Sequence, residues 1–189
     1  MDNRFILVLI NGKAGTGKDT FVKHCMEYAN KEANNCNVYN IHRSDIPKFY
    51  LQGIGWDGKK DEESRSLLKH TVDFMENKGL LERRIKNVIT FVTTTTINKS
   101  VVIFYHVRDP IVIDKLMGEY IGSEILPISL LLTRKTNDTT EPEDWWRLEN
   151  YSYTMTIRLE NTIESSKHAA DSFMDFILNK TYTTVKNIQ

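Results

Sequence analysis

One segment constrains this sequence more than any other feature: Gly12-Lys13-Ala14-Gly15-Thr16-Gly17-Lys18-Asp19-Thr20. Its spacing of glycine, four residues, glycine and lysine is that of a P-loop, and it lies between an apolar run and a helical pattern. The glycines let successive backbone N–H groups point into one concavity, to which the helix N-terminus adds its positive end. A glycine-rich turn that arose by chance is the alternative, but strand, loop, lysine and helix coincide here. The segment therefore predicts a cradle for nucleotide phosphates.

The residues that close the motif predict a nucleoside triphosphate bound with Mg²⁺. Lys18 would place a positive charge across the β- and γ-phosphates, whereas the metal-binding Ser or Thr that usually follows the lysine is replaced by Asp19. Asp19 could hold Mg²⁺ directly or through water. It could instead be a first-turn acid stabilised by the helix dipole while Thr20 holds the ion. Both residues are candidate metal ligands, and Thr20 is slightly favoured.

The apolar runs predict a parallel sheet. Short runs rich in β-branched and aromatic residues occur at 5–10, 38–41, 101–105 and 128–132, with a weaker one at 153–157. Their near-continuous apolar character is typical of strands that helices cover on both faces. We expect an α/β fold of the doubly wound, three-layer P-loop NTPase type, nucleoside-kinase-like, with about five parallel strands. Ligands should collect at the carboxyl edge of that sheet.

Helix signals lie between these runs. We expect a helix over 61–78 and a polar, irregular stretch over 44–59. Residues 80–99 could form a helix or a strand because β-branched residues lower helix propensity without excluding it, and we expect a helix. Asp109 and Pro110 predict an N-cap and first helical residue, and Asn161 with Glu164 has capping-box spacing before the last helix.

Composition limits the class of protein. A chain of 189 residues fits one domain over 1–189, with an acceptor-binding insert at about 44–98 and a lid loop at about 134–149. Lys plus Arg and Asp plus Glu are both 25, so no global charge attracts a large nucleic acid. No apolar run approaches the ~20 residues that span a membrane. Two cysteines outside any metal-ligand spacing favour free thiols in a reducing compartment, so we expect a soluble, cytoplasmic protein.

Two arginines at predicted strand ends are candidates for catalysis. Arg108 follows the third strand, where a guanidinium can clamp phosphate, although a surface ion pair is an equal alternative. Arg134 leaves the fourth strand and could close over the transferring phosphoryl group as part of a lid. His106 stands where a Walker B aspartate would end the third strand, and a structural role suits it better than a catalytic one.

The stretch after the second strand is where a nucleotide kinase binds its acceptor. Asp45 could accept a proton from the acceptor or orient its oxygen, or could simply cap a helix. Four cations are candidates for holding phosphate, and Trp56 could stack on a base or pack in the core. The cations are Lys48, Lys59, Arg65 and Lys69. Arg65 and Lys69, at i and i+4, are more often a solvated helix face.

The Gly-Lys-Asp-Thr ending at Gly17 to Thr20 resembles the P-loop of bacteriophage-type deoxynucleoside monophosphate kinases and of animal-type phosphomevalonate kinase. Four further segments are similar to a bacterial and phage set of P-loop proteins: 45–48, 55–60, 107–110 and 150–153. The resemblance implies an adenylate-kinase-like core with ATP on the P-loop. It departs at His106, where the phage kinase has an acid, and at Thr154, where an aspartate often stands.

The expected function is phosphoryl transfer from ATP to a (deoxy)nucleoside monophosphate or a similar small acceptor. One alternative is a kinase of another metabolite. A second is a nucleotide-binding module without turnover, because a Walker B acid is missing. A GTPase is disfavoured because no Asn-Lys-x-Asp run occurs. The sequence gives no oligomeric state.

Overall fold

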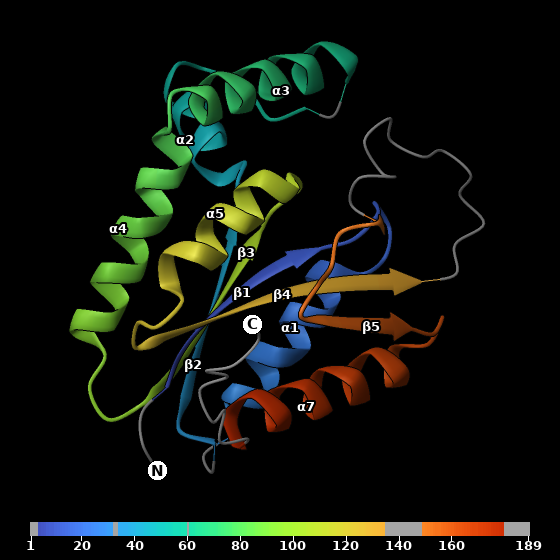
Figure 1. The fold of residues 1–189 in the computed structure, drawn as a ribbon. Coiled ribbons are helices and arrows are strands. Elements are labelled where there is room, and N and C mark those ends of the chain that lie inside the picture. Colours follow the sequence, from blue (N-terminus) through green and yellow to red (C-terminus); the bar gives the residue numbers. More distant parts are fainter. Residues whose placement is uncertain (1–3, 32–33, 60, 135–148, 180–189) are drawn as a thin grey trace.

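A single parallel sheet forms the centre of the protein. The structure is a computed structural model that describes residues 4–31, 34–59, 61–134 and 149–179. Five strands lie in the order β2-β3-β1-β4-β5, and every neighbouring pair is parallel (Figure 1). They are β1 (Phe5–Asn11), β2 (Cys36–His42), β3 (Ser100–His106), β4 (Ile125–Arg134) and β5 (Met155–Leu159). The predicted α/β fold with about five parallel strands is confirmed.

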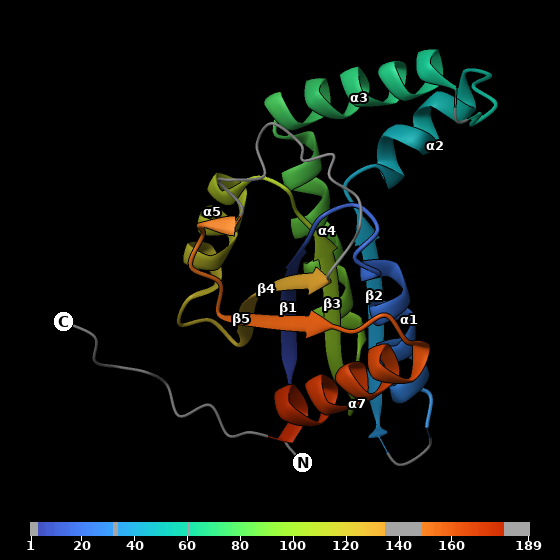
Figure 2. The ribbon, with the colours of Figure 1, turned by 90° about the vertical axis from the view of Figure 1, so that its right-hand side faces the viewer.

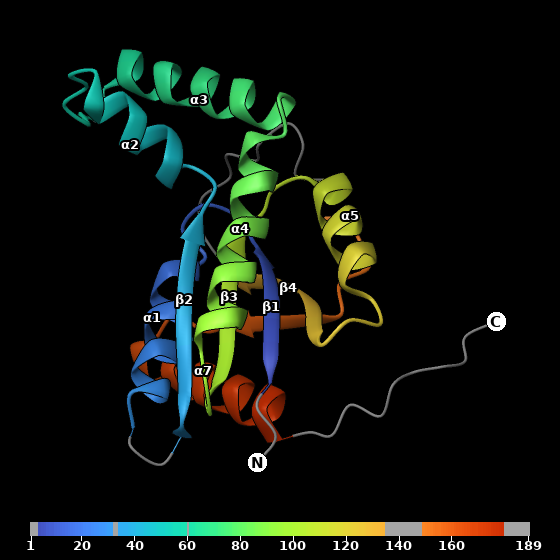
Figure 3. The same cartoon turned by 90° about the vertical axis from the view of Figure 1, so that its left-hand side faces the viewer.

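Helices cover both faces of this sheet. The described helices are α1 (Lys18–Ala29), α2 (Asp45–Gly53), α3 (Glu62–Asn77), α4 (Leu80–Thr95), α5 (Pro110–Tyr120) and α7 (Ile163–Asn179). Of these, α1, α4, α5 and α7 pack on the sheet. Figure 2 shows α1 and α7 against one face, and Figure 3 shows α4 and α5 against the other. None of the helices in the described ranges combines the length and the apolar character that a membrane span needs.

The alternation along β1 explains why two layers of helices are needed. Ile6, Val8 and Ile10 pack into the cluster formed with α1 and α7. Leu7 and Leu9 pack into the cluster formed with α4 and α5. All five side chains are 0–1% exposed, so burying both faces removes the whole strand from water.

Three phenylalanines join the α1 and α7 layer to the sheet. Phe21 of α1 lies edge-on to Phe104 of β3, with ring centroids 6.4 Å apart. Phe173 of α7 contacts both rings at 5.6 and 6.1 Å. This packing fixes α1, and with it the loop that precedes α1, relative to the sheet.

The chain between β2 and β3 forms a helical excursion beyond the carboxyl ends of these strands (Figure 1). The irregular structure predicted over 44–59 is wrong in part, because Asp45–Gly53 is the helix α2. Pro47 is buried in its first turn, where a missing N–H leaves no helical hydrogen bond unmade. The helix predicted over 80–99 is confirmed as α4, which ends earlier, at Thr95.

Two local predictions can be compared with the helix ends. Asp109 caps α5 as expected, since its carboxylate accepts a hydrogen bond from the Ile111 amide at 2.9 Å. The capping residue of α7 was predicted one position too early. It is Thr162, not Asn161, whose hydroxyl accepts from the Ser165 amide at 3.1 Å.

The fifth strand begins two residues later than predicted, at Met155. Tyr153 is held outside it because its hydroxyl accepts a hydrogen bond from Asn11 Nδ2 at 3.1 Å. Thr154 exchanges side-chain bonds with Ser129 of β4, as its amide donates to Ser129 Oγ at 2.9 Å. Pairing between β4 and β5 therefore begins at Leu130 and Met155.

Candidate functional site

The P-loop passes over the carboxyl end of the sheet, between β1 and α1. Gly12 has φ 151°, and a Cβ on it would lie 2.4 Å from the Leu132 carbonyl oxygen of β4. Its amide donates to Asn11 Oδ1 at 2.7 Å. Gly15 and Gly17 have φ of 75° and 87°, a conformation that glycine adopts without strain. The sequence positions of these glycines thus coincide with the positions where the backbone requires them.

Lys18 is drawn back onto the loop. Its ammonium donates to the carbonyl oxygens of Gly12 and Lys13 at 2.6 and 2.7 Å. Burial, and then the nearby Arg108 guanidinium, lower the pKa of Lys18 to about 8, against a smaller opposing effect of Asp19. Burial makes the charged Lys18 ammonium unfavourable in the free protein. An anion that replaces the Gly12 and Lys13 carbonyl oxygens would therefore be bound favourably by this ammonium.

Arg134 lies against the P-loop from the β4 side. A Cβ on Gly17 would meet the Arg134 guanidinium at 3.3–3.4 Å, and its Nη2 donates to Ser166 Oγ of α7 at 2.9 Å. Its Nε is buried and has no hydrogen-bond partner within the described residues. The predicted lid over 134–149 otherwise lies outside the described residues, at 135–148. Arg134 itself is anchored beside the loop.

Three cations converge where β2 and β3 end. Arg108 is close enough to Lys18 to lower the pKa of that ammonium, and Arg43 in turn lowers the pKa of Arg108, after the larger effect of partial burial. Arg43 donates to Glu76 of α3 at 3.1 Å and lies 3.8 Å from Asp73. Mutual repulsion among these cations favours binding of a polyanion between them.

A second cluster lies at the same edge, around Asp19. His42 and His106 are partners in the β2–β3 register, and their rings stack with centroids 3.9 Å apart. Asp19 Oδ1 lies 3.6 Å from His42 Nε2 and 3.9 Å from His106 Nε2. Burial, followed by His42 and Lys18, lowers the pKa of His106 to about 4, so its ring is neutral near pH 7. Thr20, the other candidate metal ligand, is exposed in the same first turn of α1.

The residues predicted to bind the acceptor are scattered. The Asp45 carboxylate accepts a hydrogen bond from the His42 amide at 2.8 Å, and Ser44, not Asp45, occupies the N-cap position of α2. Lys59 pairs with its neighbour Asp57 at 2.7 Å. Lys48 and Trp56 are half-buried. The Trp56 Nε1 is buried and lacks a partner in the part of the chain that the structure describes.

Arg65 and Lys69 stand apart from the phosphate cradle. Both are exposed on α3, which Figure 1 shows beyond the end of the sheet. Within the described ranges neither forms an ion pair. The structure therefore does not bring these two side chains to the P-loop.

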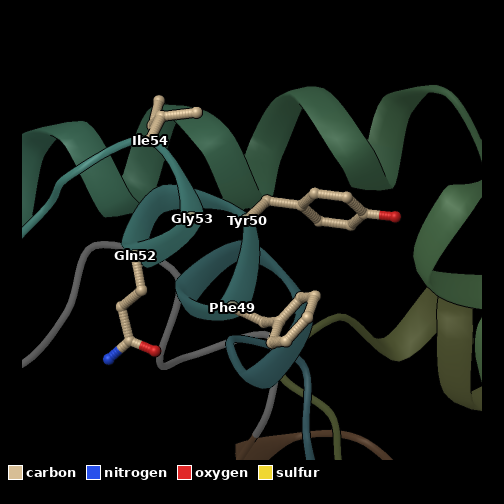
Figure 4. Close-up of a pocket in the computed structure, with 5 residues that line it drawn as sticks. All are labelled: Phe49, Tyr50, Gln52, Gly53 and Ile54. Atoms are coloured by element: carbon tan, nitrogen blue, oxygen red, sulfur yellow. The ribbon is translucent and has the colours of Figure 1, made fainter.

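An apolar hollow of about 410 Å³ lies on α2 (Figure 4), in the excursion beyond the carboxyl ends of β2 and β3. It is lined by Phe49, Tyr50, Gln52, Gly53 and Ile54. Phe49 is 72% exposed, and its ring lies edge-on to that of Tyr50, with centroids 5.9 Å apart. Exposed aromatic rings at the carboxyl edge offer a stacking surface for a planar ligand.

Three residues near the cradle were not singled out from the sequence: Asn40, His42 and Arg43. The available signal was their place at the end of a predicted strand, where a parallel sheet collects its ligand-binding groups. That signal does not say that β2 lies beside β3, which is what brings His42 to His106.

Comparison with known proteins supports the fold. No protein-family model matches the sequence, and no curated protein matches it. A solved structure described as a "putative kinase" from Chloroflexus aurantiacus J-10-fl aligns over 96% of this chain and 100% of that chain, with a TM-score of 0.51 and 11% identity. Two Mycobacterium tuberculosis APS kinase structures, one of them in complex with AMPPNP and APS, cover 93% of this chain and 99% of theirs.

The APS kinase structures have TM-scores of 0.48 at 11% and 12% identity. The fold assignment therefore rests on the likeness to the Chloroflexus structure. At such low identity it establishes shared architecture alone. Together with the sheet order and the position of the glycine-rich loop, it shows that this chain has the three-layer α/β fold of P-loop proteins.

Proposed function

We propose that this protein transfers the γ-phosphoryl group of ATP to a small phosphorylated acceptor, most simply a (deoxy)nucleoside monophosphate, in the cytoplasm. One observation carries the proposal: a P-loop lysine whose charge is held at a cost by burial, with Arg108 and Arg43 converging beside it and Arg134 packed against Gly17. Several cations around one glycine-rich loop suit a triphosphate whose charge grows more dispersed during transfer.

In this proposal Lys18 exchanges the carbonyl oxygens of Gly12 and Lys13 for the β- and γ-phosphates. Arg134 bears on the γ-phosphate from the β4 side, and Arg108 approaches from the β3 side. Catalysis then consists of positioning and charge neutralisation, because the chemistry needs no covalent intermediate on the protein.

Mg²⁺ fits the oxygen donors at the start of α1. The Thr20 hydroxyl and the Asp19 carboxylate are both exposed in the first helical turn, next to the cradle, and Mg²⁺ prefers such oxygen ligands. When bound, Mg²⁺ would neutralise phosphate charge. Thr20 is the favoured ligand because the Asp19 carboxylate faces two imidazoles.

The acceptor would lie between the P-loop and the α2–α3 excursion. The hollow on α2 offers aromatic rings for a base. Arg43, directly after β2, and Lys48, within α2, could hold its phosphate. Asp45 remains a candidate for orienting the acceptor oxygen. Lys59, Arg65 and Lys69 remain candidates only if the excursion closes toward the P-loop.

A nucleotide-binding module without turnover is the second candidate, because His106 stands at the end of β3 where a Walker B acid is expected. Neither a neutral imidazole nor Asn40 beside it supplies the anionic charge of that acid.

ADP release from MgATP, measured with a panel of nucleoside and deoxynucleoside monophosphates, tests the proposal. Turnover with one acceptor that Lys18→Ala abolishes and Lys23→Ala preserves would support a nucleotide kinase, since the Lys23 side chain is 74% exposed. Tight MgATP binding without turnover for any acceptor would instead favour the binding module. Turnover that survives in Lys18→Ala would contradict the proposed site.

A further inference from the structure

We propose that Asp19, His42 and His106 form a binding site for a transition-metal dication of the Zn²⁺ type, separate in its ligand chemistry from the Mg²⁺ that accompanies ATP. The three side chains come from different elements, α1, β2 and β3, yet one potential ligand atom of each lies within 4.8 Å of the others. The inference concerns the nucleotide-free protein and does not depend on kinase activity.

The distances suit a small ion. Asp19 Oδ1 lies 3.6 Å from His42 Nε2 and 3.9 Å from His106 Nε2. A tetrahedral ion with bonds of about 2.0–2.1 Å holds its ligand atoms about 3.3 Å apart. Between Asp19 and each imidazole the contraction needed is therefore well under 1 Å, and the Asp19 side chain, 78% exposed, has room to move by that amount.

The imidazole rings must change their tilt. The two ring planes now lie 21° from parallel. An ion that lies in the plane of both rings requires a larger angle between these planes. The His42 side chain is 32% exposed, which leaves room for this rotation. Metal binding therefore exchanges ring stacking for coordination, and that exchange is observable in the imidazole resonances.

Asn40 already orients the two nitrogens. Its amide oxygen lies 2.8 Å from His106 Nε2, and its amide nitrogen lies 3.3 Å from His42 Nε2. His42 Nε2 therefore carries its lone pair, which now accepts from the Asn40 amide and would be released to the ion. His106 must move its Nε2 proton to Nδ1, a tautomer change that releases no net proton. Asn40 then lies beside the ion, where its amide can hold a metal-bound water.

Two nitrogen donors select the class of metal. Imidazole suits Zn²⁺, Co²⁺ and Ni²⁺, whereas Mg²⁺ prefers an all-oxygen shell. Three side-chain ligands leave a coordination position open, as in catalytic rather than structural zinc sites. The cluster lies at the sheet edge near Lys18, so a ligand in that position would be close to the phosphate cradle.

The test is Zn²⁺ binding by the tag-free, nucleotide-free protein, measured by calorimetry and by Co²⁺ absorption. We expect one ion per chain, tetrahedral Co²⁺ bands, and shifted His42 and His106 resonances. His42→Gln and His106→Gln should each weaken Zn²⁺ binding at least tenfold, whereas His168→Gln, at an exposed position of α7, should leave it unchanged. Excess Mg²⁺ should not displace the ion.

Absence of stoichiometric Zn²⁺ binding would overturn the proposal, as would equal affinity in wild type and His42→Gln, or displacement by Mg²⁺ at equal concentration. If His106→Gln fails to fold, Asp19→Asn supplies the second variant, because that carboxylate is exposed. Kinase activity without Zn²⁺ binding would refute this site and leave the proposed function standing. Zn²⁺ binding without kinase activity would support this site and contradict the proposed function.

Discussion

The depressed pKa of Lys18 predicts that nucleotide affinity falls as pH rises above about 8. In the free protein this ammonium begins to lose its proton near that pH. A bound triphosphate stabilises the charged form and raises the Lys18 pKa in the complex. Between the two pKa values, binding takes up one proton, so the association constant falls about tenfold per pH unit, or about 1.4 kcal/mol.

The same shift has an opposite consequence for stability. The pKa of Lys18 is about 8 in the folded protein and 10.5 in a model lysine. A cation with a lowered pKa destabilises the folded state while charged, so its contribution improves as pH rises from about 8 toward 10.5. The limit is about 3 kcal/mol, reduced by the partial solvent access of the side chain. Lys18→Met should therefore stabilise the nucleotide-free protein near pH 7 while weakening nucleotide binding.

Calorimetry of MgATP binding between about pH 7.5 and pH 9.5 is the assay, with buffers of different ionisation heats to count the proton taken up. Wild type and Lys23→Ala should show the tenfold fall, and Lys18→Met should show weak binding with no such slope. A flat affinity in wild type, or the same slope in Lys18→Met, would refute the assignment of the titrating group.

Three substitutions test the packing that positions the loop. Gly12→Ala would place a Cβ 2.4 Å from the Leu132 carbonyl oxygen. We therefore expect it to lower the free energy of unfolding in urea by roughly 2–4 kcal/mol and to abolish nucleotide binding. Gly118→Ala in α5, with open space around it, is the control and should be neutral or slightly stabilising. Phe104→Ala, in the aromatic cluster, should cost about 3–5 kcal/mol, and a loss under 1 kcal/mol would contradict the packing. Asp109→Ala should lower the free energy of unfolding by about 1 kcal/mol, which thermal melts can resolve, while Asp109→Asn should restore most of it.

Local chemistry explains how much of the fold could be predicted. The β1 run is apolar at every position from Phe5 to Ile10, and only a strand buried on both faces accommodates that pattern. The helix α2 was not predicted because the polar residues of 44–59 suggested an irregular stretch, although Pro47, in its first turn, is compatible with a helix. The strand β5 begins later than predicted because Tyr153 forms a hydrogen bond with Asn11, a contact that no local sequence pattern reveals.

The candidate site divides in the same way. The P-loop could be predicted because its glycines and Lys18 act within one short segment. The positions of Arg43, His42 and Asn40 depend on β2 lying next to β3, and sequence spacing contains no information on strand order. The hydrogen bond from Arg134 to Ser166 of the last helix could not be predicted either, because it joins residues 32 positions apart in the sequence.

The central position of β1 also matters for how the chain is made. The first strand in the sequence pairs with β3 and β4, whose first residues are Ser100 and Ile125. On a ribosome, β1 would therefore emerge long before either partner, and at about 5–20 residues per second the delay lasts roughly 5–20 s. Throughout that interval an apolar segment with both edges open remains exposed to other chains. Its safest early partner is α1, through Phe21 and Val22, so mutations that weaken α1 should lower soluble yield during expression more than they lower the equilibrium stability of the finished protein.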